Sequence, residues 1–312
     1  MCENITYKYL HKDKINLIEK KLKNNIDNPK LLIEQINLSD GRNINVIQDG
    51  VLLAGTKQRV AKLFLKEILK ANPHIKTVLY AGTYNGYGAI ATAYGAYKLG
   101  LNCEVFVSKK LEIPNEKILE SRQINTLHAL RAKIYLCHTY KEARELEYNK
   151  STIKKNNNSW NTLPEYYISP MGLNDDNKIM TDLLSKQIIK ASKNTLLENH
   201  ANPRIWLVTG SGGIAMSILK AFPHATLFIL LTGGGKYKKK VHDWAKKEKN
   251  VFIIKNENKL NSKDERENRY LYYSSVKNYD DLIWPYIKKY ANNNDFIWNI
   301  ASDDYWTEDG LL

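Results

Sequence analysis

Hydrophobic positions along the chain form short compact runs that alternate with amphipathic stretches. The compact runs are separated by glycines and polar residues, and they predict strands at 44–48, 77–81, 103–107, 205–208, 226–231 and 296–300. Apolar residues spaced three and four apart predict helices at 60–69, 89–99 and 215–222. Strands that alternate with helices across short loops predict an α/β fold of mostly parallel sheets with helices on both faces.

Two polar stretches interrupt this pattern. Residues 148–161 and 256–268 are rich in Asn, Lys and Ser, and we expect them to form exposed loops or boundaries between lobes. No internal repeat is visible. A chain of 312 residues is long enough for one α/β unit of two lobes or for two ordinary domains.

The composition is that of a globular protein, with 43% hydrophobic and 26% charged residues. No apolar run is long enough to cross a bilayer and the N-terminus lacks a signal pattern, so we expect a soluble, cytoplasmic protein. The histidines and the three cysteines lack paired ligand spacing, so no metal site is predicted.

The net charge of +14 is the unusual bulk property. Lysines on solvated helix faces explain it, and so does a polyanionic partner such as nucleic acid. The sequence has no compact Arg-rich cluster and no interleaving of aromatic and basic residues, which single-strand binders use. Solvated lysines are therefore the favoured interpretation, with weak nucleic-acid association as the alternative.

The loop Gly210-Ser211-Gly212-Gly213-Ile214 lies between a predicted buried strand and a predicted helix. Glycines let backbone amides converge at a helix N-terminus, where a phosphate binds well. The loop lacks the Gly-Lys-Ser/Thr ending of a P-loop. It fits the dinucleotide pattern G-x-G-x-x-A, but no acidic residue follows the next strand at Leu231 to hold a ribose. A tight turn that binds nothing is a further alternative.

Lys57 follows a short apolar run and a glycine, and it opens the helix predicted at 60–69. The positive end of a helix dipole disfavours a charged amine. A partly neutral amine suits Schiff-base chemistry with an aldehyde. Lys57 and the glycine loop together therefore predict a phosphorylated aldehyde cofactor, with its aldehyde at the lysine and its phosphate at the loop.

Three motifs in this order resemble the pyridoxal-phosphate (PLP) enzymes of fold type II, the tryptophan synthase β-like class. Ala-Gly-Thr-Lys57-Gln-Arg is similar to the Gly-Gly-Asn-Lys-Thr-Arg of 1-aminocyclopropane-1-carboxylate deaminase and D-cysteine desulfhydrase. Gly-Thr-Tyr-Asn85-Gly and the helix after it resemble that group's Ser-Asn-His loop and its helix ending Ala-Lys-Leu-Gly-Leu. Thr-Gly210-Ser-Gly-Gly is similar to its phosphate loop. The likeness covers roughly residues 30–235.

The resemblance implies roles for individual residues. Lys57 would form the Schiff base, Asn85 would hydrogen-bond the cofactor's ring hydroxyl, and residues 210–214 would hold the phosphate. Thr83, Tyr84 and Gly86 would hold the substrate carboxylate, although Tyr84 and Gly86 replace the family's Ser and His. Ser302 is the candidate partner of the pyridine nitrogen.

The resemblance also implies a fold of two lobes and a homodimer. We expect a large cofactor-binding lobe formed by 1–59 and 166–312, and a small lobe inserted at 60–165. The activity implied is that of a lyase or deaminase acting on a small amino acid, while elimination, replacement and racemisation share its early steps. The alternatives are a PLP enzyme that acts on an amino-acid adduct of a nucleotide or DNA base, and a non-catalytic nucleotide- or DNA-associated protein that keeps the fold.

Overall fold

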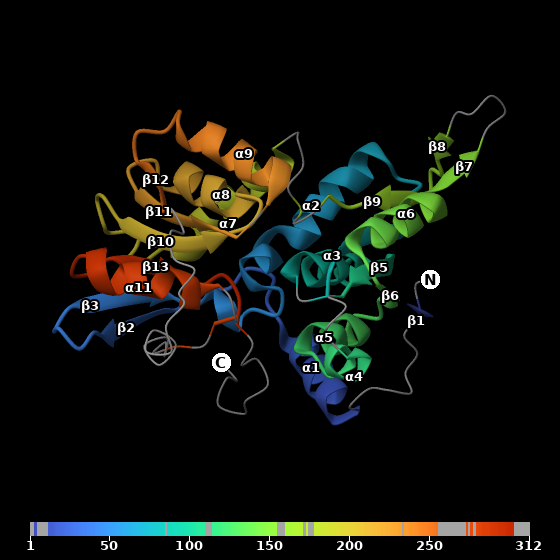
Figure 1. Ribbon diagram of the computed structural model, residues 1–312, viewed down its shortest axis with the longest axis horizontal. Coiled ribbons are helices and arrows are strands. Elements are labelled where there is room, and N and C mark those ends of the chain that lie inside the picture. The colour runs from blue at the N-terminus through green and yellow to red at the C-terminus, as the bar shows by residue number, and fades with distance from the viewer. Residues whose placement is uncertain are drawn as a thin grey trace. The chain divides into compact units, whose positions relative to one another are not determined.

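The computed structural model forms two compact units, Met1–Asp27 with Lys57–Met180 and Asn28–Thr56 with Thr181–Leu312 (Figure 1). The parts of the chain that the structure describes are residues 3–4, 12–84, 86–109, 114–154, 160–170, 173, 178–232, 234–254, 273, 275–276 and 279–302.

The first unit contains a five-stranded sheet with the strand order β1-β6-β5-β4-β9. Its strands are β1 (Glu3–Asn4), β4 (Thr77–Thr83), β5 (Asn102–Ser108), β6 (Lys133–Cys137) and β9 (Tyr166–Ile168). All neighbours are parallel except β1, which pairs antiparallel with β6. The central strands β4 and β5 are buried along most of their length, as expected for a parallel sheet covered on both faces.

Helices cover both faces of this sheet and form a further layer. They are α1 (Lys12–Asn24), α2 (Gln58–Ala71), α3 (Tyr87–Lys98), α4 (Asn115–Leu119), α5 (Arg122–Ala129) and α6 (Tyr140–Ser151). The helices α3 and α6 both contact β4 and β5, and α2 packs on α3. At that helix contact a Cβ on Gly95 would lie 2.7 Å from the carbonyl oxygen of Ala61, so a glycine allows the close approach.

The second unit contains a six-stranded sheet with the strand order β12-β11-β10-β13-β3-β2. Its strands are β2 (Ile33–Asn37), β3 (Asn43–Ile47), β10 (Arg204–Thr209), β11 (Thr226–Leu231), β12 (Val251–Ile254) and β13 (Phe296–Trp298). All pairs are parallel except β2 with β3, which form a hairpin. The helices are α7 (Ile179–Ser192), α8 (Gly213–Ala221), α9 (Gly235–Ala245) and α11 (Asp280–Tyr290). In Figure 1, α8 and α9 lie on one face of the sheet and α11 on the other.

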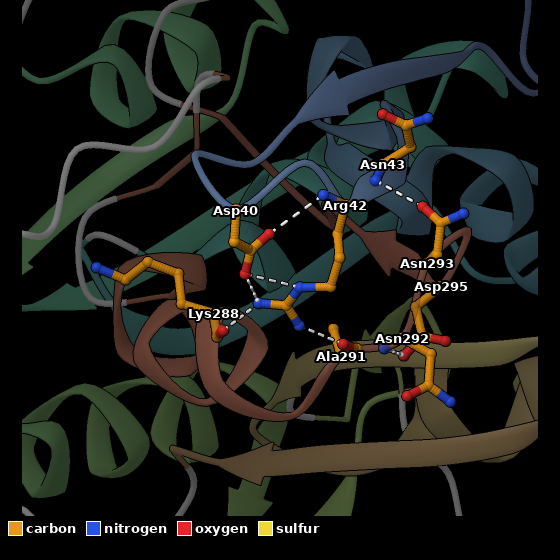
Figure 2. A network of polar contacts seen from close by, with 8 residues as sticks. All are labelled: Asp40, Arg42, Asn43, Lys288, Ala291, Asn292, Asn293 and Asp295. Carbon is orange, nitrogen blue, oxygen red and sulfur yellow. Dashed lines mark hydrogen bonds and ion pairs between the residues drawn. The ribbon is translucent and has the colours of Figure 1, made fainter.

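Arg42, in the turn between β2 and β3, ties the hairpin to the C-terminus of α11 (Figure 2). Its guanidinium donates hydrogen bonds to the backbone carbonyls of Lys288 and Ala291 and also pairs with Asp40. The last carbonyls of a helix lack intrahelical partners and favour a cation. This network therefore fixes the part of the sheet where the strands β3 and β13 begin.

The expected strands and helices are present, with ends that differ by at most two residues from those expected. The expectation of a loop at 148–161 was wrong in part. The helix α6 continues to Ser151, and an antiparallel hairpin of β7 (Thr152–Lys154) and β8 (Trp160–Thr162) follows. Polar composition does not prevent backbone pairing in a hairpin, which explains the difference. The second predicted loop, 256–268, lies outside the described residues.

The unit boundaries differ from the expected lobe boundaries, 1–59 with 166–312 and 60–165. β9 pairs with β4, so residues 166–168 belong to the sheet of the first unit. Helix α1 packs against α5, which places the N-terminal residues in that unit as well. Both contacts join segments far apart in the sequence, and no local pattern predicts them.

Candidate functional site

The carboxyl ends of β10, β13 and β3 lie side by side in the second unit, because these neighbouring strands are parallel. The glycine loop follows β10, the segment 299–302 follows β13, and the loop 48–57 follows β3. Loops at the carboxyl edge of a parallel sheet are the usual place for a ligand. Two of the sequence-predicted elements, residues 210–214 and Ser302, are therefore brought to one edge.

The glycine loop has a conformation that requires glycine. Gly212 has φ of +84°, and a Cβ there would lie 2.4 Å from Cγ2 of Val241. Helix α8 begins at Gly213, so its first amides have no acceptor within the helix. A Cβ on Gly210 would meet nothing nearer than the Thr232 hydroxyl at 3.9 Å. The loop thus offers helix N-terminal amides and open space, as a phosphate site needs.

Lys57 lies where the loop after β3 enters helix α2. The 3₁₀ turn η3 (Gly55–Lys57) immediately precedes α2, so Lys57 sits at the helix start as expected. The backbone amide of Thr56 donates to the Ile300 carbonyl at 3.0 Å, which joins this loop to the segment after β13. Thr56, the residue before Lys57, is thereby fixed at the carboxyl edge of the sheet, where Ser302 also lies.

Burial lowers the pKa of the Lys57 amine to about 8. An ordinary lysine has a pKa near 10.5, so at neutral pH Lys57 supplies a neutral amine far more often than a surface lysine does. The cause is desolvation, which penalises the charged form. The sequence indicated only the helix dipole as a cause, and burial is a second cause that the structure adds.

Thr83, Tyr84 and Gly86 belong to the first unit, at the carboxyl end of β4. The Tyr84 amide donates to the Ser108 carbonyl and the Gly86 amide to the Thr83 carbonyl, both at 3.0 Å. Gly86 caps the N-terminus of α3. The loop has the strand–turn–helix geometry that suits a carboxylate. Asn85, between these residues, lies outside the described residues.

The residues present fit a phosphorylated aldehyde. A buried amine of lowered pKa is the group that adds to an aldehyde, and a helix N-terminal glycine loop is the group that binds a phosphate. Ser302 is buried, with 5% exposure, in the segment that follows β13. Its hydroxyl is one of the groups able to face a pyridine nitrogen.

Sequence reasoning missed three buried residues of the second unit that hold the loop before Lys57. The Trp298 indole Nε1 donates to Asp49 Oδ2 and to Thr56 Oγ1, at 3.1 Å in each case. Asp49 and Thr56 are 1% and 0% exposed. Trp298 ends β13 and Asp49 closely follows β3, so their position at the carboxyl ends of neighbouring strands was the signal that could have found them.

The sequence matches no model of a known protein family, and no curated protein matches it. Among the residues that the structure describes, no helix combines the length and hydrophobicity that a membrane span requires.

Solved structures do match the fold. An ACC deaminase homologue aligns over 94% of this chain and 95% of its own, at 15% identity and a TM-score of 0.58. A hydrogen sulfide-producing enzyme from Fusobacterium nucleatum aligns over 96% and 100%, at 14% identity and a TM-score of 0.59. Diaminopropionate ammonia lyase from Escherichia coli, in its apo form, aligns over 99% and 95%, at 10% identity and a TM-score of 0.55.

These neighbours are PLP enzymes of fold type II, and the chain shares their tryptophan synthase β-like fold. The sequence-based expectation of the fold is confirmed. At sequence identities of 10% to 15%, this similarity shows a shared fold alone.

Proposed function

We propose that this chain is a PLP-dependent enzyme that binds the cofactor covalently through Lys57 and acts on a small amino acid as a lyase or deaminase. The observation that carries the proposal is the Lys57 amine, on a fold shared with PLP-dependent lyases and deaminases. The side chain as a whole is partly exposed, but desolvation of its nitrogen lowers the pKa to about 8. A surface lysine would have neither the burial nor the lowered pKa.

Each part of the chain has a distinct task in this proposal. Residues 210–214 bind the phosphate through the first amides of α8, and the Ser302 hydroxyl faces the pyridine nitrogen. Thr83, Tyr84 and Gly86 bind the substrate carboxylate at the N-terminus of α3, with Asn85 beside the ring hydroxyl. When bound, PLP supplies a conjugated ring that withdraws electrons from the substrate's Cα. Lys57 Nζ, when not bonded to the cofactor, accepts the proton from Cα.

The test is covalent trapping of PLP at Lys57. Purified protein incubated with PLP and reduced with borohydride should carry the cofactor mass on the peptide that contains Lys57. The yield should rise with pH through about 8, because protonation blocks the amine below its pKa. An unburied lysine would instead give a yield that is still rising near pH 10.

Lys62 provides the matched control on the same helix. Its Nζ pairs with Asp27 Oδ2 at 3.1 Å and is partly exposed. Lys57→Ala should abolish the labelled peptide, while Lys62→Ala should leave it unchanged. A wild-type protein that PLP does not label at Lys57 contradicts the proposal and leaves a non-catalytic protein that keeps the fold. Unreduced protein loaded with PLP is then titrated with D- and L-amino acids, and a change of its absorbance identifies the substrate.

A further inference from the structure

The Trp298 indole holds both ends of the loop that leads to Lys57. Its single N–H lies 3.1 Å from Asp49 Oδ2, near the start of the loop, and 3.1 Å from Thr56 Oγ1, the residue before the lysine. Trp298 itself is 0% exposed and belongs to β13 in the middle of the sheet. A rigid aromatic side chain on a central strand thus fixes the chain immediately before Lys57.

Backbone contacts reinforce this anchor. Besides the Thr56–Ile300 hydrogen bond, Gly55 has φ of +58°, and a Cβ there would lie 2.1 Å from the Ile300 carbonyl oxygen. The Asn299 side chain donates to Gln48 Oε1 at 3.0 Å at the start of the same loop. The loop 48–57 lies in close contact with the segment 299–302, so a change in that segment changes the position of Thr56.

The residue after Lys57 is anchored as well, within the first unit. Gln58 is 0% exposed, and its Nε2 donates to Asn25 Oδ1 at 2.9 Å and to the Ile26 carbonyl at 3.0 Å. Lys57 therefore lies between two residues whose side chains are each held by buried or partly buried hydrogen bonds.

We infer that Trp298 is a positioning residue for Lys57, acting through Thr56 with Asp49 as the second acceptor. The inference rests on the proposed function, because it assigns Trp298 the task of placing the Lys57 amine for addition to the cofactor's aldehyde. Addition reactions depend steeply on the placement of the attacking atom. Loss of the Trp298 N–H frees the Thr56 hydroxyl, loosens the chain before Lys57 and slows the reaction of the amine.

The second unit contains a matched control for a purely structural role. Trp206 on β10 is also buried, and its Nε1 donates to Asp295 Oδ2 at 2.7 Å. Asp295 precedes β13, so this tryptophan–aspartate pair lies toward the amino end of the strands, whereas the Trp298 pair lies at their carboxyl end. Trp206→Phe and Trp298→Phe remove the same kind of hydrogen bond at opposite ends of the same sheet.

The experiment measures the rate at which PLP becomes trappable by borohydride on the Lys57 peptide. Trp298→Phe should lower this rate about tenfold or more, and Trp206→Phe should leave it within about twofold of the wild type. Thermal denaturation should show a similar loss of stability in both variants. Equal rates for the two variants overturn the inference, since Trp298 would then act on stability alone.

Thr56 supplies a second comparison if Trp298→Phe does not fold. Thr56→Val keeps the shape of the side chain but removes the hydroxyl, and Thr56→Ser keeps the hydroxyl. The valine variant should react about tenfold more slowly, and the serine variant should restore the rate. Equal rates in both variants contradict the inference. Absence of any Lys57 label in the wild type is a separate outcome, which overturns the proposed function and this inference with it.

Discussion

Lys57 shows why the environment of a residue outweighs its identity. The chain has 47 lysines and arginines, and most of them are solvated charges. Burial lowers the pKa of this one amine to about 8, and the hydroxyl of Thr56, the residue before it, accepts a hydrogen bond from Trp298. The chemistry proposed here depends on both properties together.

Gly212 is the residue at which we expect a small substitution to be costly. Gly212→Ala puts an L side chain at φ of +84° and its Cβ 2.4 Å from Val241 Cγ2. Loss of stability should reach about 1–3 kcal/mol, and PLP should bind more weakly because the phosphate loop must shift. Urea denaturation and a PLP titration measure the two effects.

Gly41 is the matched control for that substitution. It has φ of +86°, and a Cβ there would meet nothing within 4 Å. Gly41→Ala should therefore show the backbone cost alone, about 1 kcal/mol, with PLP affinity unchanged. Adding Val241→Ala to the Gly212→Ala variant should relieve the clash. Unchanged PLP affinity in Gly212→Ala would show that the loop does not bind the phosphate.

At the scale of elements, the candidate functional groups lie at the ends of strands, whereas strand interiors form the core. The apolar residues of β10, β13 and β3 build the core, and the loops at their carboxyl ends provide the candidate groups. Helices contribute their N-termini to ligands, and they also bury charged groups of their own. Glu147 on α6 is such a group.

Glu147 is 0% exposed, and burial raises the pKa of its carboxyl to about 7, against the opposing effect of Arg144. The unfolded chain loses this proton near 4.5, so stability falls as pH rises from about 4.5 through 7 and is constant above. Glu147→Gln should remove this slope and raise the free energy of unfolding at pH 8 by about 1–3 kcal/mol. Arg144 is half-exposed and keeps its hydration in the variant.

Glu142, on the same helix, should respond in the opposite direction. Although its slight burial opposes the effect, hydrogen bonds from the His138 and Thr139 amides lower the pKa of this carboxyl. Its ionised form stabilises the fold above the unfolded pKa, and that contribution is lost as pH falls. Glu142→Gln should therefore reduce stability at pH 8. Urea denaturation at pH 4.5 and pH 8 separates the two variants, and a destabilised Glu147→Gln protein at pH 8 would contradict the prediction.

At the scale of the whole molecule, the charge of +14 is distributed over both units. In the second unit, α9 and the turn after it carry exposed lysines, among them Lys238, Lys239 and Lys246. Helix α1 of the first unit is also rich in lysine. A charge spread in this way favours weak binding to any polyanion.

A polyanionic partner, the alternative to solvated lysines, predicts weak, sequence-independent binding to single-stranded DNA that falls steeply between about 50 and 200 mM salt. The double substitution of Lys238 and Lys239 to Gln should weaken binding at low salt, and substitution of both to Arg should not. Fluorescence anisotropy with a labelled oligonucleotide measures this. Absence of binding at low salt would leave the lysines as solvated surface charges, and binding that resists salt would indicate a dedicated nucleic-acid site.

The sequence by itself determined the alternation of strands and helices, the position of Lys57 at a helix start and the glycine loop after β10. These features are local, because periodicity, glycine and helix ends act over a few neighbouring residues. Hence the fold class was predicted correctly, while the hairpin at 152–162 was hidden by its polar composition.

Only the tertiary structure decided which strands are neighbours and which residues surround the lysine. The strand order places β13 between β10 and β3, which brings residues about 240 positions apart, Trp298 and Thr56, to 3.1 Å. It also showed that burial lowers the pKa of Lys57. Strand order and burial arise from packing between distant segments, and no window of the sequence contains that information.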